Sequence, residues 1–123
     1  MFKIEIYEDK NGFSELNDEL MELARKAPEN KDARIQLNQI VYCIDLLKRQ
    51  GTRLPDKITK HLQGDIWELR PGKNRVLYFY FEGETFVLLH MFRKQTQKTP
   101  KSEIEKALRE SNDYKSRNGR QSR

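Results

Sequence analysis

Two arginines on neighbouring predicted strands are the residues of this 123-residue chain that are best placed to do chemistry. Arg70 ends the segment DIWELR and Arg75 stands at the start of NRVLYFYFE, and the turn residues PGKN lie between the two arginines. If this turn closes a hairpin, the two guanidinium groups stand opposite each other, where like charges repel. An anion bound between them would relieve the repulsion, so we predict an anion-binding site at this position.

A third cation joins the same face in either of two strand registers. The next predicted strand, ETFVLLHMFRK, follows the turn EGE. A two-residue loop at this turn places His90 and Lys94 on the face of Arg75. A three-residue loop places Arg93 there instead, because a slip of one residue turns every side chain to the other face. Arg93 and Lys94 are therefore alternatives for the third cation.

Glu68 and His90 are the candidates for proton transfer beside these cations. Glu68 alternates onto the face of Arg70 and can accept a proton from a hydroxyl group, and an imidazole exchanges protons near neutral pH. Both residues also have a structural interpretation. Glu68 would then be the salt-bridge partner that holds an arginine, and His90 would be a hydrogen-bonded histidine on a largely apolar strand.

Positive charge is concentrated in the later part of the chain. Residues 1–45 hold six Lys and Arg against ten Asp and Glu, whereas residues 46–75 hold eight against three and residues 113–123 hold four against one. This asymmetry indicates a surface for a polyanion on the later half of the protein.

Length and composition narrow the class of protein. A chain of this length forms one domain, which we place at residues 1–112, followed by a basic, flexible tail at 113–123. The single cysteine, Cys43, cannot form an internal disulfide. With two histidines and no CxxC or HxxxH spacing, we predict no metal site and no cofactor.

The sequence has no long apolar run and no leader pattern, so we expect a cytoplasmic protein that does not enter the membrane.

Hydrophobic periodicity predicts the elements that position these residues. Alternation over residues 2–8 indicates a strand, and helical spacing indicates helices from about 13 to 27 and from about 31 to 50. Asn11 or Ser14 caps the first helix, and Gly51 ends the second. After the three strands, Thr99 is the predicted N-cap of a short last helix that ends near Asn112.

These elements make an α+β fold in which two N-terminal helices pack on a small, mainly antiparallel sheet that is followed by a C-terminal helix. Their order is β-α-α-β-β-β-α, or the same order with one more short strand at Ile58–Leu62.

Four short motifs follow one another along the chain: WELR at 67–70, RVLY at 75–78, LLHMFRK at 88–94 and TQKTP at 96–100. In this order and spacing they resemble the HigB-like branch of the RelE/ParE toxin superfamily, whose members are often described as phage-derived toxins. The resemblance implies a RelE-like fold and the toxin of a type II toxin–antitoxin pair. Such a toxin is an endoribonuclease that cuts mRNA, generally on the ribosome, and is neutralised by a helix-turn-helix antitoxin.

The resemblance also implies a metal-free mechanism, in which the ribose 2′-hydroxyl attacks the adjacent phosphorus. Arg70 and Arg75 would then stabilise the negative charge that develops on the phosphoryl oxygens. Arg93 and Lys94 align with a pair that is commonly Lys-Lys in the family. The basic residues expected to contact the RNA backbone or the ribosome are Arg53, Lys57, Lys60, Lys73 and Lys98.

The aromatic residues divide between the two faces of the predicted sheet. Trp67, Tyr78 and Tyr80 lie opposite the arginines, and we expect them to pack under the helices rather than to stack on bases. Phe79 and Phe81 lie on the arginine side, where the last helix or a bound antitoxin would cover them.

Two other functions remain as alternatives. One is a non-catalytic toxin that inhibits DNA gyrase, as in the ParE branch, and the other is a basic accessory protein that binds nucleic acid without chemistry. A gyrase inhibitor does not need convergent cations, so the pairing of Arg70 with Arg75 favours the ribonuclease.

Overall fold

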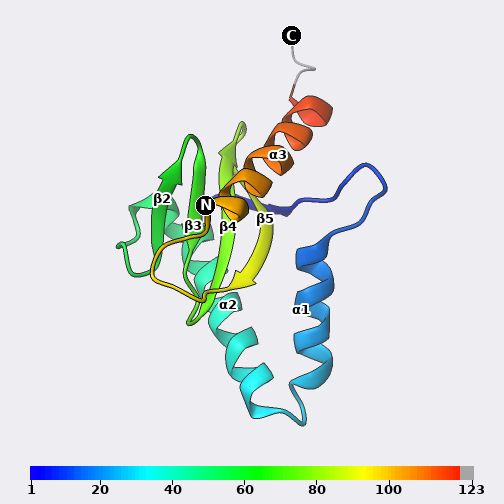
Figure 1. Ribbon diagram of the computed structural model, residues 1–123, viewed down its shortest axis with the longest axis vertical. Helices are drawn as coiled ribbons and strands as arrows, with labels where there is room; N and C mark the ends of the chain where they lie inside the picture. The colour runs from blue at the N-terminus through cyan, green and yellow to red at the C-terminus, as the bar shows by residue number, and fades with distance from the viewer. Residues whose placement is uncertain (120–123) are drawn as a thin grey trace.

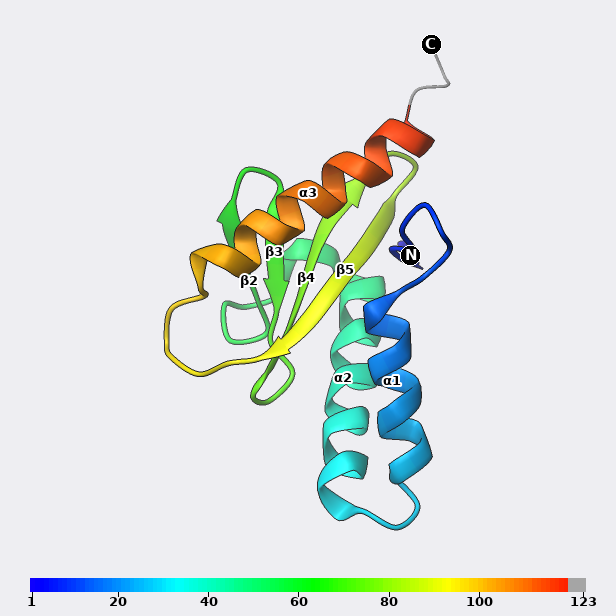
Figure 2. The same ribbon diagram turned by 45° about the vertical axis from the view of Figure 1, so that its right-hand side comes forward.

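The computed structural model describes residues 1–119, in which a five-stranded sheet is covered by a helix pair on one face and a single helix on the other (Figures 1 and 2). This arrangement confirms the predicted α+β class. Each described helix is too short or too polar to cross a lipid bilayer. In chain order the elements are β1 (Lys3–Ile6), α1 (Glu15–Lys26), α2 (Lys31–Gln50), the 3-10 turn η1 (Gly51–Arg53), β2 (Thr59–Gln63), β3 (Ile66–Leu69), β4 (Asn74–Phe81), β5 (Thr85–Arg93) and α3 (Lys101–Asn118).

The strands are ordered β1-β5-β4-β3-β2 across the sheet. β1 pairs with β5 in parallel, and the remaining neighbours are antiparallel, so the predicted β3–β4–β5 meander is confirmed. The extra short strand that the sequence left open is also present, as β2, which forms one edge of the sheet. The β2 edge therefore borders the hairpin that carries the two arginines.

The α1–α2 pair has the caps that its sequence predicts. The hydroxyl of Ser14 accepts a hydrogen bond from the N–H of Asn17, and the side chain of Asn30 does the same for α2. Gly51 ends α2 with a φ of 64°, a conformation that favours glycine. The pair packs on the sheet through a core that includes Leu16, Ile40, Cys43, Leu47, Tyr78 and Leu88.

α3 packs on the opposite face of the sheet and is longer than the sequence predicted. Tyr114 is 8% exposed and meets the ring of Phe79 edge-on, at a centroid distance of 5.9 Å, and that of Phe81, at 5.0 Å. The last helix therefore covers these two rings, as expected. Its predicted end near Asn112 is wrong, because burial of Tyr114 and its hydrogen bond to Glu5 stabilise further turns. Residues 120–123 of the predicted tail lie outside the described residues.

A β-bulge in β5 decides the register beside Arg75. Phe81 pairs with Thr85 across a three-residue turn, but Leu77 pairs with His90 and Arg75 pairs with Phe92, because the register shifts after Tyr78. The turn thus has the three residues of one predicted alternative, whereas the face near Arg75 carries the residues predicted for a two-residue loop. His90 lies on this face, and Arg93 does not.

Removal of residues 113–123 is expected to destabilise the protein. This truncation deletes Tyr114 from the core beneath α3, and loss of a buried aromatic side chain costs about 3–5 kcal/mol. A chain that ends at Gly119 keeps the whole of α3 and serves as the control. Denaturant unfolding followed by circular dichroism measures the difference. Equal stability of the two truncated chains would contradict the assignment of these residues to the folded domain.

Stability at high pH is expected to depend on Tyr78. Burial raises the pKa of Tyr78 to about 12 from 10.0, and the hydroxyl lies 2.6 Å from that of Thr59. The folded protein holds this proton more tightly than the unfolded chain, so stability is complete below pH 10 and falls as pH rises toward 12. Unfolding measured across this range should show a loss of about 3 kcal/mol that Tyr78→Phe lacks. Parallel curves for the two proteins would refute this assignment.

Candidate active site

The carboxylate of Glu68, on β3, is the buried centre of the candidate site. The residue has no exposed surface and accepts hydrogen bonds from Arg70, whose Nε lies 3.0 Å from Oε2, and from the hydroxyl of Thr99. The Nε of Arg75 lies 3.8 Å from the same oxygen. One carboxylate thus orients two arginines and the segment that precedes α3.

The bond from Thr99 corrects the predicted cap of α3. In the structure the N-cap position is Pro100, and no side chain caps the helix there. The hydroxyl of Thr99 instead donates a hydrogen bond to Glu68. Thr99 was not among the predicted site residues, although the TQKTP motif that contains it was singled out.

Each arginine has a second anchor on the backbone. Arg70 donates from Nη1 to the carbonyl of Asp56 at 3.0 Å. Arg75 donates from Nη1 to the carbonyls of Gly72 and Asn74, at 2.9 and 2.8 Å. Burial lowers the pKa of Arg75, the charge of Glu68 raises it and that of Arg70 lowers it again. An arginine so placed remains charged at physiological pH. The predicted convergence of Arg70 and Arg75 on one face is therefore present in the structure.

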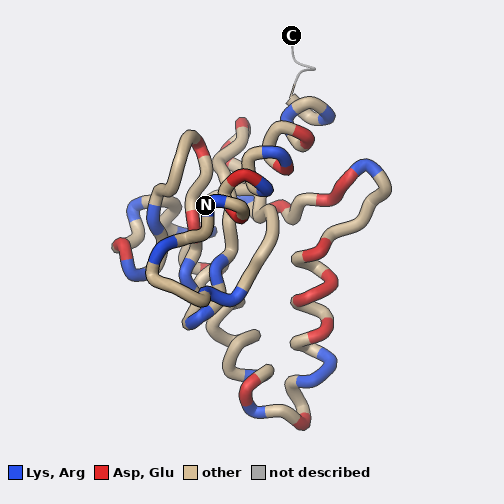
Figure 3. Tube along the Cα trace, viewed as in Figure 1, with Lys and Arg blue, Asp and Glu red and all other residues tan. Residues whose placement is uncertain are grey.

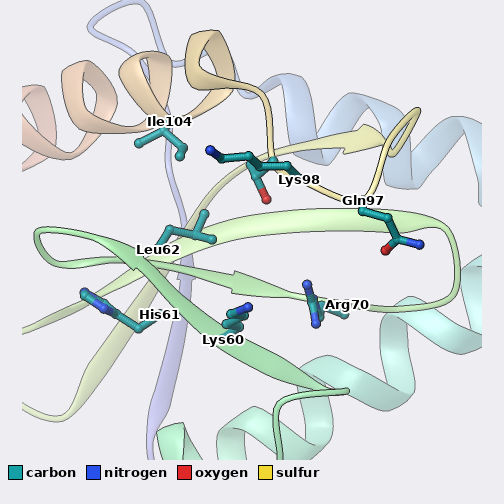
Figure 4. A pocket seen from close by; sticks show the side chains of 8 residues that line it. Lys60, His61, Leu62, Arg70, Gln97, Lys98 and Ile104 are labelled. Atoms are coloured by element: carbon teal, nitrogen blue, oxygen red, sulfur yellow. The ribbon is translucent and has the colours of Figure 1, made fainter.

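A cationic pocket of about 220 Å³ opens beside Arg70 (Figure 4). Lys60 pairs with Glu68 across β2 and β3, so its side chain lies on the face of the site. Lys98 approaches from the segment between β5 and α3, and a second hollow of about 640 Å³ shares this lysine with the pocket. Other residues that line the pocket are His61, Leu62, Gln97, Thr99 and Ile104.

His90 is enclosed rather than presented to the pocket. Its side chain is 1% exposed, and α3 supplies a carboxylate to each ring nitrogen: Glu110 lies 2.6 Å from Nδ1 and Glu103 lies 2.8 Å from Nε2. Each ring nitrogen therefore has a carboxylate partner on α3. The geometry matches the structural interpretation of His90, because the ring joins β5 to α3 and neither nitrogen is left for a substrate.

The structure does not bring Arg93 to the pair of arginines. Asn74 pairs with Arg93 and donates to the Oε1 of Gln36 on α2 at 3.1 Å, so this cross-strand pair faces the helix hairpin. Arg93 instead lines a hollow with Glu19 and Glu22 of α1. The alternative with a three-residue turn predicted Arg93 beside Arg75. The bulge in β5 shifts the register by one residue, so Arg93 lies on the other face of the sheet.

The remaining predicted cations do not line the cationic pocket, although the register of β5 places Lys94 on the face of Arg75. The backbone N–H of Lys94 donates to the carbonyl of Lys73 at 2.9 Å, which joins the end of β5 to the β3–β4 turn. Arg53 in η1, Lys57 in the segment before β2 and Lys73 are exposed. Figure 3 shows Lys and Arg gathered along these segments, whereas Asp and Glu line much of α1. Within residues 1–119, no group of three or more His, Cys, Asp or Glu could hold a metal ion.

The fold that carries this site is RelE-like. One chain of the archaeal RelE–RelB complex from Pyrococcus horikoshii OT3 aligns over 76% of this chain and 96% of its own length, with a TM-score of 0.53 at 15% identity. Chains of two further complexes align with TM-scores of 0.49. A chain of the RelBE2 complex from Mycobacterium tuberculosis aligns at 17% identity over 76% of this chain and 98% of its own length. A chain of the YoeB–YefM complex from Staphylococcus aureus aligns at 10% identity over 78% of this chain and 99% of its own length.

The sequence also places the chain in a family. Residues 18–112 match the family described as phage-derived protein Gp49-like (DUF891), and the chain belongs to it. No curated protein matches the sequence. Family and fold together confirm the resemblance to the RelE/ParE superfamily that the four motifs indicated.

Replacement of Glu68 by alanine is expected to destabilise the protein by about 3–5 kcal/mol, because it leaves Arg75 and Arg70 without their shared carboxylate in a largely buried position. Asp45→Ala breaks an exposed ion pair with Arg49 on α2 and should cost less than about 1 kcal/mol. Urea unfolding of both variants tests this difference. A Glu68→Ala protein as stable as Asp45→Ala would show that the carboxylate does not organise the site.

Proposed function

We propose that this protein is the toxin of a type II toxin–antitoxin pair and that it cleaves mRNA on the ribosome. The observation that carries the proposal is the shared anchoring of Arg70 and Arg75 by the buried carboxylate of Glu68, beside a pocket that also contains Lys60 and Lys98. Four cations at one end of the sheet suit a phosphodiester and its neighbours along a strand.

The arginines perform the electrostatic part of the reaction. When a ribose 2′-hydroxyl attacks the adjacent phosphorus, negative charge accumulates on the phosphoryl oxygens. The side chain of Arg70 is 23% exposed and borders the pocket, so its guanidinium can donate to these oxygens. Arg75 is held by the carboxylate of Glu68 and by the carbonyls of Gly72 and Asn74, and its positive charge stabilises the same developing negative charge. Lys60 and Lys98 bind phosphates on either side.

Glu68 acts as a positioning residue in this mechanism. It is fully buried, and both of its oxygens are engaged by Arg70, Arg75 and Thr99. Since His90 is also enclosed, the two residues that the sequence marked for proton transfer have structural partners instead. The protein alone should therefore cut free RNA slowly, and the ribosome would complete the acid–base chemistry.

The partner of the proposed toxin is an antitoxin. The structural relative from Pyrococcus horikoshii OT3 is named as a RelE–RelB complex, which supports a protein partner for this fold. By the motif resemblance, we propose that this partner carries a helix-turn-helix domain and that both proteins act in the cytoplasm.

Loss of one arginine is expected to lower cleavage strongly without unfolding the protein. Arg70→Ala should lower transcript cleavage about 100- to 1,000-fold, the usual cost of removing one donor to a developing charge. Mapping of new 5′ ends in cells that express the protein measures this loss. Arg49→Ala, on the exposed side of α2, is the control and should cleave normally.

Other outcomes of this experiment would identify a different function. Growth arrest that persists in Arg70→Ala, together with loss of DNA supercoiling, would replace the ribonuclease with a gyrase inhibitor. Expression without any growth defect would instead indicate an accessory nucleic-acid-binding protein. Arg70→Lys separates charge from geometry, because lysine keeps the charge and lacks the planar fork.

A further inference from the structure

An aromatic pocket lies on the sheet face opposite the arginine site. It has a volume of about 330 Å³, which is within the range of roughly 300–1,000 Å³ that is usual for ligand pockets. Its walls come from the N-terminus, from η1 and from strands β3, β4 and β5. The residues that line it are Phe2, Thr52, Trp67, Tyr80 and Phe86.

The rings of this pocket are not all covered by the helix pair. The sequence predicted that Trp67, Tyr78 and Tyr80 pack under the helices. Tyr78 has no exposed surface and Trp67 packs, partly buried, against the same core, so the prediction is wrong only for Tyr80. Tyr80 is 47% exposed, and Trp67 is partly exposed. The reason is that α2 ends at Gln50, so η1 and Phe2 border this part of the sheet instead of a helix.

The exposed ring of Tyr80 is held in a fixed orientation. It meets Phe86 edge-on at a centroid distance of 5.4 Å and Phe2 at 6.4 Å. The ring of Trp67, which also lines the pocket, lies 5.3 Å from that of His61 on β2. A flat partner can therefore stack here without ordering the side chains first, which lowers the entropic cost of binding.

The chain connects this aromatic pocket directly to the arginine site. Thr52 lines the pocket, and the carbonyl of Asp56, four residues later, accepts the hydrogen bond from Arg70. Four residues span at most about 14 Å of extended chain, so the two sites lie within reach of one short nucleic-acid strand. This segment runs to the β2 edge of the sheet, where the two faces meet.

The connecting segment carries cations that have no protein partner. Arg53 and Lys57 are exposed on it, and Lys60 follows on β2. None of the ion pairs found within the described part of the chain includes any of these three residues. Unpaired cations between an aromatic pocket and a phosphate site are the arrangement that binds single strands, in which rings stack on bases and cations follow the backbone.

We propose that the aromatic pocket binds an unpaired base of the same RNA strand whose phosphate lies at Arg70 and Arg75. The strand then passes around the β2 edge, with its phosphates beside Arg53 and Lys57. This inference rests on the proposed function for the identity of the strand as RNA. It adds a second contact point, on the opposite face of the sheet, that is independent of the chemistry of cleavage.

The single tryptophan of the chain allows a direct test. Trp67 lines the pocket, so its fluorescence reports a base that stacks there. A short 2′-O-methyl RNA, which cannot be cleaved, should quench this emission as it is titrated into the intact protein. Binding without a change in emission would show that RNA uses the arginine site alone, and it would overturn the inference.

Substitution of Tyr80 tests the contribution of the ring. Tyr80→Ala should weaken binding of the 2′-O-methyl RNA about 5- to 150-fold, because one stacked base contributes about that factor. Tyr80→Phe keeps the ring and should bind as the original protein does. Thermal unfolding confirms that each variant is folded, and equal affinity of folded Tyr80→Ala and Tyr80→Phe would contradict the proposal.

The same titration separates failure of the proposed function from failure of this inference. In Arg70→Ala, cleavage should be lost, whereas quenching of Trp67 by the 2′-O-methyl RNA should persist at a higher RNA concentration. A protein that never cleaves RNA but shows this quenching would refute the ribonuclease and retain the aromatic site. Quenching by an added antitoxin peptide and not by RNA would assign the pocket to a protein partner and overturn the inference.

Discussion

The structure depends on one buried negative charge placed under two positive ones. A carboxylate with no access to water is costly unless it is paired and hydrogen-bonded. Glu68 meets this requirement with Arg70, Arg75 and Thr99, which come from three different segments. The same requirement prevents the two guanidinium groups from separating as like charges otherwise would. The position of these two guanidinium groups on the sheet is therefore a consequence of how an internal charge is neutralised.

α3 also helps to position the site, because polar contacts hold this helix along its whole length. Glu103 near its start and Glu110 at its middle bind His90. Toward its end Lys115 lies 2.5 Å from Asp65, and the hydroxyl of Tyr7 donates to Asp113 at 2.6 Å. Between these contacts the helix covers Phe79 and Leu89. The segment that carries Thr99 and Lys98 is thus attached to a helix with a fixed position, and this fixes one wall of the cationic pocket.

Much of this arrangement could be predicted from the sequence, because it follows from local rules. The helix pair, its Ser14 and Gly51 caps and the meander all come from periodicity and turn chemistry. The convergence of Arg70 with Arg75 follows from a single hairpin. These features need no knowledge of contacts between distant segments.

The features that were mispredicted depend on contacts between distant segments. The bulge in β5 has no turn residue to signal it, and it moves Arg93 away from the site. The length of α3 is decided by Tyr114, whose partners Phe79 and Phe81 lie more than thirty residues earlier in the chain. Local sequence predicted Thr99 as a cap, and it gives no sign that the hydroxyl of Thr99 donates to Glu68, which is 31 residues away. Exposure of Tyr80 follows from where α2 ends in space, which periodicity does not specify.

The bulge has a further consequence for how this hairpin tolerates change. Since the extra residue in β5 lies between the EGE turn and the arginines, the pairing of Arg75 with Phe92 is fixed separately from the pairing of Phe81 with Thr85. A change in the length of the distal turn can be absorbed before it reaches the cations. The tip at Gly83 faces open space, but its φ of 71° favours glycine, so a foreign peptide or tag grafted at this turn should leave Gly83 in place.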